Sequence, residues 1–117
     1  MPDENKIDYL EIPTTDIAAS KSFFIEMFDW QFTDYGDDYS SFEDGRVTGG
    51  FFKSDQSVSY SNGSVLIVFY ANVLEAALQK VKRCNGSIVR EIFSFPGGRR
   101  FHFADPAGNE FAIWSDK

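Results

Sequence analysis

The sequence predicts an α+β fold made of two βαβββ modules. Strand-like and helix-like segments follow the order β, α, β, β, β, and the same order begins again about 55 residues later. The 117 residues and an ordinary globular composition fit one compact domain. Because one module cannot bury both faces of its sheet, we expect both modules to form one curved mixed sheet, with a concave pocket inside and the helices outside.

The domain organisation follows from this repeat. The whole chain, 1–117, is interpreted as a single domain, with module one at about 5–54 and module two at about 63–117. A linker at about 55–62 separates them, because the stretch SDQSVSYSNG is polar and rich in turn-forming residues.

Module one begins with a predicted strand over 7–13, IDYLEIP, in which Tyr9 and Glu11 share one face. Asp16 has the residue type and position of an N-cap for the helix predicted over 17–30. Three short β-type runs follow, separated by the turn signals DD and DG, over 30–36, 39–45 and 46–52.

Module two repeats the pattern, with a predicted strand over 64–70 and a helix over 72–86. Asn72 is the predicted N-cap of this helix, and Asn85-Gly86 is its predicted stop. Three more strands are predicted over 87–95, 99–104 and 110–115, and DPAGN forms the turn before the last one.

The charge and the cysteine content exclude several kinds of partner. A formal net charge of −7 repels phosphate backbones and anionic lipids, so we expect binding neither to nucleic acid nor to a membrane. The one cysteine, Cys84, cannot form an internal disulfide, and the acidic N-terminus has no signal-peptide pattern. These features predict a cytoplasmic protein.

Three segments carry a family resemblance: EIPTTDIAASKSFFIEMFDWQF (11–32), VFYANVLEAALQKVKRCNGSIV (68–89) and FPGGRRFHFADPAGNEFAIWS (95–115). In this order they resemble the vicinal oxygen chelate superfamily of glyoxalase I, bleomycin-resistance proteins and extradiol dioxygenases. The similarity is greatest to its small, uncharacterised glyoxalase-related proteins. The resemblance implies the two-module architecture and, because such proteins commonly pair, a homodimer.

Metal-binding members of this superfamily place His, Glu or Gln ligands at four strand positions. The resemblance maps these positions onto Tyr9, the segment 49–51, Leu66 and Ala112. Tyrosine binds metals rarely, and none of the other side chains supplies a donor atom. We therefore expect neither a metal nor another cofactor, and no metal-assisted mechanism.

Two residues are candidate proton acceptors. His102, the only histidine, should share a strand face with Arg100, directed toward the pocket or the solvent. The simpler alternative is a half-exposed strand histidine that makes one hydrogen bond. Glu11 would have a raised pKa if its carboxylate is poorly solvated, or it pairs with Arg100 or Arg46 across the sheet.

Other polar and aromatic residues of the closing hairpin have structural explanations beside functional ones. Asp105 is expected to shape the DPAGN turn, and Glu110 to be exposed at the start of its strand. Arg99 and Arg100 either hold a ligand carboxylate or form an exposed basic pair. Trp114 either stacks on a flat ligand or packs in the core.

The first functional hypothesis is a metal-independent protein that binds a small, planar or aromatic molecule in the concave pocket. The expected ligand-binding residues are Tyr9, Glu11, Leu66, Val68, Tyr70, Arg100, His102 and Trp114. The alternative is a glyoxalase-related lyase or isomerase in which His102 or Glu11 is the catalytic proton acceptor. A third hypothesis is an interaction module with a vestigial pocket.

Overall fold

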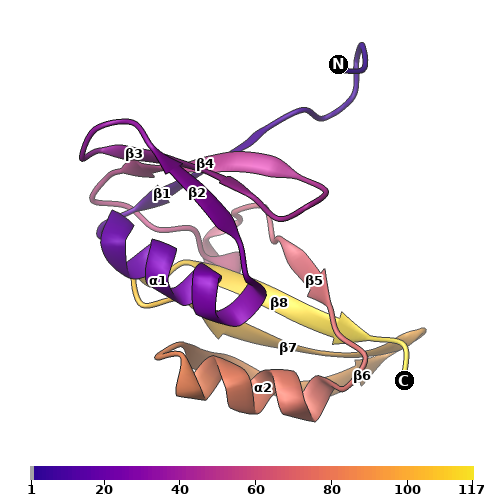
Figure 1. Cartoon of the computed structure of the whole chain (residues 1–117). Coiled ribbons are helices and arrows are strands. Elements are labelled where there is room, and N and C mark those ends of the chain that lie inside the picture. The colour runs from indigo at the N-terminus through magenta and orange to yellow at the C-terminus, as the bar shows by residue number, and fades with distance from the viewer. Residues whose placement is uncertain (1) are drawn as a thin grey trace.

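The computed structural model describes residues 2–117 and confirms the predicted α+β class (Figure 1). The first module contains β1 (Leu10–Thr14), α1 (Ile17–Phe28), β2 (Gln31–Asp34), β3 (Tyr39–Glu43) and β4 (Thr48–Lys53). A 3-10 helix, η1 (Tyr60–Asn62), follows it. The second module contains β5 (Val68–Tyr70), α2 (Leu74–Arg83), β6 (Ser87–Phe95), β7 (Gly98–Ala104) and β8 (Glu110–Ser115).

The strands form two four-stranded sheets, where the sequence predicted one curved sheet. The first sheet has the order β1-β4-β3-β2, and the second has the order β5-β8-β7-β6. Each is mixed, because β1 is parallel to β4 and β5 is parallel to β8, while the other pairs are antiparallel. The sheets stay separate because β1 and β5 each pair with the last strand of their own module.

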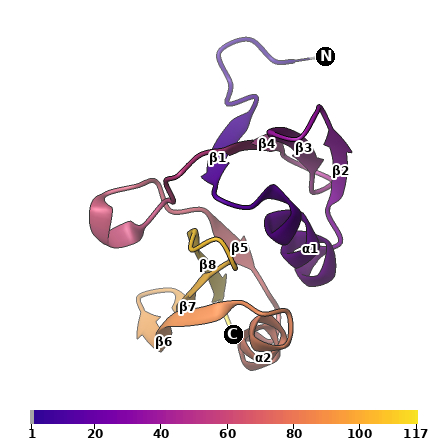
Figure 2. The same cartoon turned by 90° about the vertical axis from the view of Figure 1, so that its left-hand side faces the viewer.

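Helix α1 lies between the first sheet and the second module, where an outer position was expected (Figure 2). The Phe24 ring is 5.5 Å from Phe51 of the first sheet and 5.2 Å from Phe111 of the second, measured between ring centroids. Its neighbour Phe23 reaches Phe103 at 5.8 Å. Because phenylalanines on α1 contact both sheets, the hydrophobic core is continuous between the modules.

Helix α2 covers one face of the second sheet. Its apolar residues join Phe101 and Phe103 in the core. Strand alternation therefore places Arg100 and His102 on the opposite face, which we call the far face of the second sheet. The far face of the first sheet is likewise the one opposite its core residues. No helix within residues 2–117 is both long and apolar enough to cross a membrane.

The helix ends test three predictions. Asp16 is confirmed as the N-cap of α1, since its carboxylate accepts a hydrogen bond from the Ala19 amide at 3.0 Å. Asn72 as N-cap of α2 is wrong: Val73 holds that position without a side-chain bond. The Asn72 side chain instead accepts a hydrogen bond from the Lys117 amine at 2.8 Å. The Asn85-Gly86 stop is confirmed, because α2 ends at Arg83.

The DPAGN turn fastens the closing hairpin to the first module. Asp105 accepts hydrogen bonds from the Ala107 and Asn109 amides, which confirms its turn-forming role. The Asn109 amide group donates to the Pro13 carbonyl at 2.7 Å, and its oxygen accepts from the Val58 amide at 2.8 Å. One short turn therefore holds β1, the linker and the hairpin together.

Candidate functional site

A cleft of about 450 Å³ separates the two modules. Its first wall comes from β1, β3 and the β3–β4 turn, and its second wall comes from β5 and β8. Its lining is rich in aromatic and aliphatic side chains, with Asp44 and Arg46 as the polar groups. The aromatic and apolar lining residues are Leu10, Trp30, Phe42, Val47, Ile67, Val68, Phe69, Tyr70 and Trp114.

The register of β5 and β8 explains the aromatic wall of this cleft. Tyr70 pairs with Trp114 across the parallel strands, and their rings meet edge to face with centroids 5.2 Å apart. Tyr70 is still 47% exposed and Val68 is 42% exposed, so their surfaces are free to meet a ligand. Of the eight predicted ligand-binding residues, Val68, Tyr70 and Trp114 line this cleft.

A second cavity, of about 390 Å³, lies beside Leu10 and Ile67, which also line the cleft. Its walls are mainly apolar, but Glu11 and Glu110 both contribute to them. Glu11 comes from β1 and Glu110 from β8, so this cavity, too, lies where the modules meet.

Glu11 belongs to a hydrogen-bonded chain with two tyrosines. The Tyr39 hydroxyl donates to the Glu11 carboxylate at 3.0 Å, and the Tyr9 hydroxyl lies 2.5 Å from the Tyr39 hydroxyl. Burial and these bonds raise the pKa of Tyr39, which keeps it protonated as a donor. The salt bridges among residues 2–117 do not include Glu11, so the alternative in which it pairs with Arg100 or Arg46 is wrong. Strand alternation could not identify Tyr39 as the partner of Glu11. Strands β1 and β3 do not pair directly, and their alignment depends on β4, which lies between them.

His102 and Glu110 form a buried pair. His102 is 1% exposed, Glu110 is 9% exposed, and the imidazole Nδ1 lies 2.8 Å from the carboxylate Oε2. The expectations of a half-exposed histidine and a solvent-exposed Glu110 are both wrong, because the linker covers this face: the Tyr60 ring lies edge-on to the imidazole at 5.2 Å. The register of the hairpin could have predicted that His102 and Glu110 are neighbours. His102 pairs with Ala112, which lies two residues from Glu110 on the same strand face.

Arg100 lies on the same face as His102, next to Trp114 of the neighbouring strand. Its guanidinium is 5.3 Å from the Phe93 ring centroid. Arg90, which the sequence analysis did not single out, lies over the same ring at 3.6 Å. Leu66, by contrast, precedes β5, is half-buried and lies outside the lining of the cleft.

The structure therefore divides the predicted site residues between the two sheets. Tyr9 and Glu11 lie on the first sheet with Tyr39, as their hydrogen bonds show. Most of the others lie on the far face of the second sheet: Val68, Tyr70, Arg100, His102 and Trp114. One chain does not bring these two groups into a single pocket, although Glu11 and Glu110 border the same cavity.

The residues at the four superfamily ligand positions do not fit a metal. Ala112 is fully buried between Val68 and His102 on the neighbouring strands, and its methyl group supplies no donor atom. Gly50 lies directly beneath the Tyr39 hydroxyl. Among residues 2–117, no three His, Cys, Asp or Glu side chains gather closely enough to hold a metal ion.

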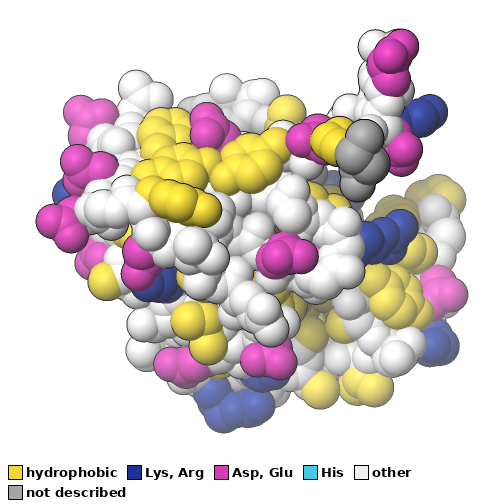
Figure 3. All heavy atoms as spheres, turned by 45° about the horizontal axis from the view of Figure 1, so that its top comes forward, with side chains coloured by type: hydrophobic (Ala, Val, Ile, Leu, Met, Phe, Trp, Pro, Cys, Tyr) yellow, Lys and Arg dark blue, Asp and Glu magenta, His cyan; other side chains and the backbone are white. Residues whose placement is uncertain are grey.

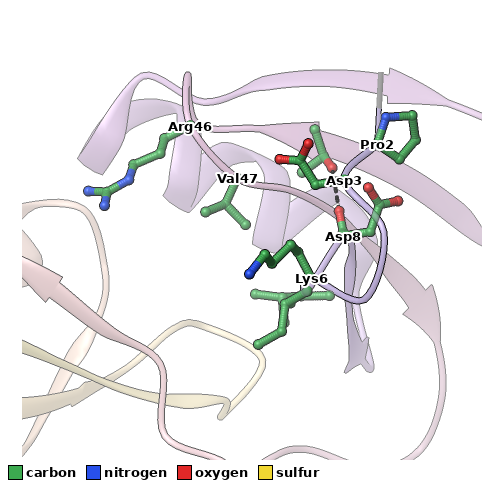
Figure 4. Close-up of a pocket in the computed structure, with 9 residues that line it drawn as sticks. Pro2, Asp3, Lys6, Asp8, Arg46 and Val47 are labelled. Carbon is green, nitrogen blue, oxygen red and sulfur yellow. Dashed lines mark hydrogen bonds between the residues drawn. The ribbon is translucent and has the colours of Figure 1, made fainter.

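A third cavity, of about 510 Å³, is formed by the N-terminal segment against the β3–β4 turn (Figure 4). It mixes the charges of Asp3, Lys6, Asp8 and Arg46, and it has no aromatic lining residue. The cavity is bordered by a segment that precedes β1, and among the predicted site residues none lines it. We therefore place the candidate site in the cleft between the modules and on the far face of the second sheet.

The chain is similar to several known proteins. It is 25% identical to the anthracycline biosynthesis protein DauV of Streptomyces sp. (strain C5), over 91% of this chain and 45% of that protein. The chain thus spans less than half the length of this relative.

Two solved structures have similar folds at low identity. A glyoxalase/bleomycin resistance protein/dioxygenase family enzyme from Burkholderia phytofirmans PsJN gives a TM-score of 0.78 at 15% identity, over 95% of this chain and all of that one. The fosfomycin resistance protein FosX of Mesorhizobium loti gives a TM-score of 0.75 at 15% identity, over 95% and 92% of the two chains.

A family model describes nearly the whole chain, from residue 6 to residue 113. The two-module order and the two mixed sheets agree with it. The protein belongs to the Glyoxalase/Bleomycin resistance protein/Dioxygenase superfamily.

Proposed function

We propose that this protein binds a small, planar aromatic molecule in the cleft between its modules, without a metal ion. The observation that carries the proposal is the aromatic wall of Tyr70 and Trp114 opposite Trp30 and Phe42. Flat rings stack favourably on such side chains, while Arg46 and Asp44 offer a few polar anchors. Sequestering a ligand requires no catalytic group. This function is therefore compatible with the lack of metal-donor side chains at the four superfamily ligand positions.

The name of the Streptomyces relative agrees with a planar ligand. DauV is an anthracycline biosynthesis protein, and anthracyclines contain a flat, fused ring system. At 25% identity this relative guides the choice of ligand class only, and the cleft is the physical basis of the proposal.

The indole N–H signals of the two tryptophans provide the test, since both side chains line the cleft. Coumarin, an uncharged planar two-ring compound, should shift both signals in a saturable manner. The Tyr70→Ala variant should weaken this binding roughly tenfold, because it removes one stacking surface. Tyr35→Ala is the matched control, since Tyr35 is an exposed tyrosine away from the cleft.

Two results would contradict this proposal. Equal weakening by Tyr35→Ala and Tyr70→Ala would show that coumarin does not bind in the cleft. The absence of any shift, with coumarin and with a series of larger flat aromatics, would favour the alternative of an interaction module with a vestigial pocket.

A second candidate function is a lyase or isomerase, which the buried His102–Glu110 pair favours. A carboxylate at Nδ1 directs the other ring nitrogen of His102 to act as a proton acceptor. Glu11 is the weaker candidate, because it is exposed and already accepts the Tyr39 hydroxyl. Turnover of α-keto or thiohemiacetal substrates that survives in both His102→Ala and Glu11→Gln would exclude these roles.

We also propose that the protein is a homodimer. Aromatic side chains gather on the first sheet (Figure 3), where Tyr9 is 41% and Phe52 is 37% exposed. A second copy that covers this surface would bury it. Phe52→Lys should then halve the molar mass measured by light scattering, whereas Val89→Lys on the second sheet should not.

The remaining partner and location proposals rest on charge and cysteine content. The net charge of −7 disfavours nucleic acid and anionic membranes. Cys84 is a free thiol, which suits the reducing cytoplasm.

A further inference from the structure

The far face of the second sheet carries an unusual buried group outside the aromatic cleft. His102 is almost completely buried, yet its Nε2 atom has no hydrogen-bond partner among residues 2–117. Buried nitrogen atoms are nearly always hydrogen-bonded, because desolvation without a partner costs free energy. An orphaned Nε2 therefore points to a group that binds there.

The carboxylate of Glu110 determines what kind of group this is. An ionised carboxylate only accepts hydrogen bonds, so with Glu110 ionised, Nδ1 of His102 is the donor across the 2.8 Å that separates it from Glu110. In the neutral imidazole, Nε2 then presents a lone pair. The missing partner is a hydrogen-bond donor, such as a hydroxyl group.

Two arginines beside His102 indicate that this partner also carries negative charge. The guanidinium groups of Arg90 and Arg100 both lie within 6 Å of the Phe93 ring centroid. The Phe93 ring is itself 5.9 Å from the imidazole. Neither arginine forms a salt bridge with a carboxylate among the described residues, whereas Lys21 pairs with Asp34 and Arg99 pairs with Glu75.

Arg100 also has a buried donor without a partner, its Nε atom. Two cations close to one ring repel each other, and an anion bound nearby would relieve this repulsion. Arg90 is exposed, which gives an anion access from the solvent.

The linker forms the cover of this site. The Glu110 Oε1 atom accepts a hydrogen bond from the Tyr60 amide at 3.1 Å, and the Glu110 amide donates to the Val58 carbonyl at 3.0 Å. The Tyr60 ring is half-exposed while it covers His102. Access of a ligand to Nε2 therefore requires the segment at Tyr60 to move away from Glu110.

We propose that this face binds a small hydroxylated organic anion. Arg90 and Arg100 hold its negative charge, and Nε2 of His102 accepts a hydrogen bond from its hydroxyl group. Glu110 is a positioning residue, since it fixes the imidazole and the cover without touching the ligand. The site does not depend on the aromatic cleft, so either assignment can fail without the other.

Because the protein has one histidine, its imidazole nitrogen signals can be followed by NMR without ambiguity. The probe is 2-hydroxybenzoate, which combines a carboxylate with a hydroxyl group. It should shift the Nε2 signal of His102 in a saturable manner at concentrations up to about 20 mM, a range suited to so small a ligand. The uncharged 2-hydroxybenzamide should bind at least fivefold more weakly, because it lacks the charge that the arginines hold.

Arg99 provides a matched control, because it adjoins Arg100 but pairs with Glu75 at 2.6 Å. Arg100→Gln and Arg90→Gln should each weaken 2-hydroxybenzoate binding roughly tenfold, and Arg99→Gln should change it less than twofold. The molar mass should remain the same in all three variants. Glu110→Gln should disturb the Nδ1–H state of the imidazole as well as binding.

Three results would overturn the inference. They are an unmoved Nε2 signal, equal loss of affinity in Arg99→Gln and Arg100→Gln, or a change of oligomeric state that accounts for the loss. Coumarin shifts of the tryptophan signals would survive each of these results if the cleft proposal is correct.

Discussion

Nδ1 of His102 lies 2.8 Å from Oε2 of Glu110, and both side chains are buried beneath the linker. This pair joins the second sheet to the segment that connects the modules, because the other carboxylate oxygen of Glu110 accepts the Tyr60 amide. The same carboxylate therefore orients the only imidazole and holds its cover in place.

Removing this carboxylate should destabilise the fold. Glu110→Ala leaves a buried imidazole and the Tyr60 amide without an acceptor, so we expect the free energy of unfolding to fall by about 3 kcal/mol. Urea denaturation measures this loss. Glu75→Ala is the control, because its pair with Arg99 is exposed to solvent and should contribute far less to stability. A loss of the same size in both variants would contradict the role given to Glu110.

Asp105 should make stability depend on pH. Burial raises the pKa of its carboxyl group, although amide hydrogen bonds from Asn109 and Ala107 oppose the shift. The folded state thus binds this proton more tightly than the unfolded state does. Its contribution to stability is present at low pH and is lost as the pH rises from about 4 through the raised pKa.

Asp105→Asn provides the comparison, since the amide oxygen can accept the same backbone hydrogen bonds but cannot ionise. The stability of the wild type relative to this variant should decrease between about pH 3 and pH 7 in urea denaturation series. A relative stability that increases with pH would show that the fold stabilises the charged carboxylate.

Gly49 and Gly50 should respond differently to the same substitution. A Cβ atom at Gly49 would clash with the Leu10 carbonyl oxygen and with the Phe42 ring, so backbone and core must shift. We expect Gly49→Ala to cost about 2–3 kcal/mol in thermal or urea unfolding.

At Gly50 an added Cβ atom would clash with the hydroxyl and the adjoining ring carbon of Tyr39, at the end of a side chain that can rotate toward solvent. Gly50→Ala should therefore cost less than about 1 kcal/mol and separate the Tyr39 hydroxyl from Glu11. Equal losses of unfolding free energy in the two variants would show that the Tyr39 side chain cannot move away from Gly50.

The fold was largely predictable because its signals are local. Strand alternation, the Asp16 cap and the DPAGN turn each act within a few residues, and all three are present in the structure. The failed prediction at Asn72 is informative, since the Lys117 amine at the other end of the module engages its side chain. A cap preference near 1 kcal/mol is easily overridden by such a contact.

The site was harder to predict because it depends on long-range placement. The burial of His102 follows from a linker that is far away in the sequence, and the Tyr39–Glu11 bond follows from the register of three strands. The position of α1 between the modules likewise depends on phenylalanines that contact both sheets. Residue spacing alone contains none of this information.

The account's central claim is that a planar ligand binds in the cleft without a metal. Native mass spectrometry of the purified protein with added coumarin, before and after dialysis against EDTA, tests it most directly. We predict the same coumarin adduct in both spectra. A stoichiometric zinc, nickel, manganese or iron ion whose removal abolishes the adduct would contradict the claim.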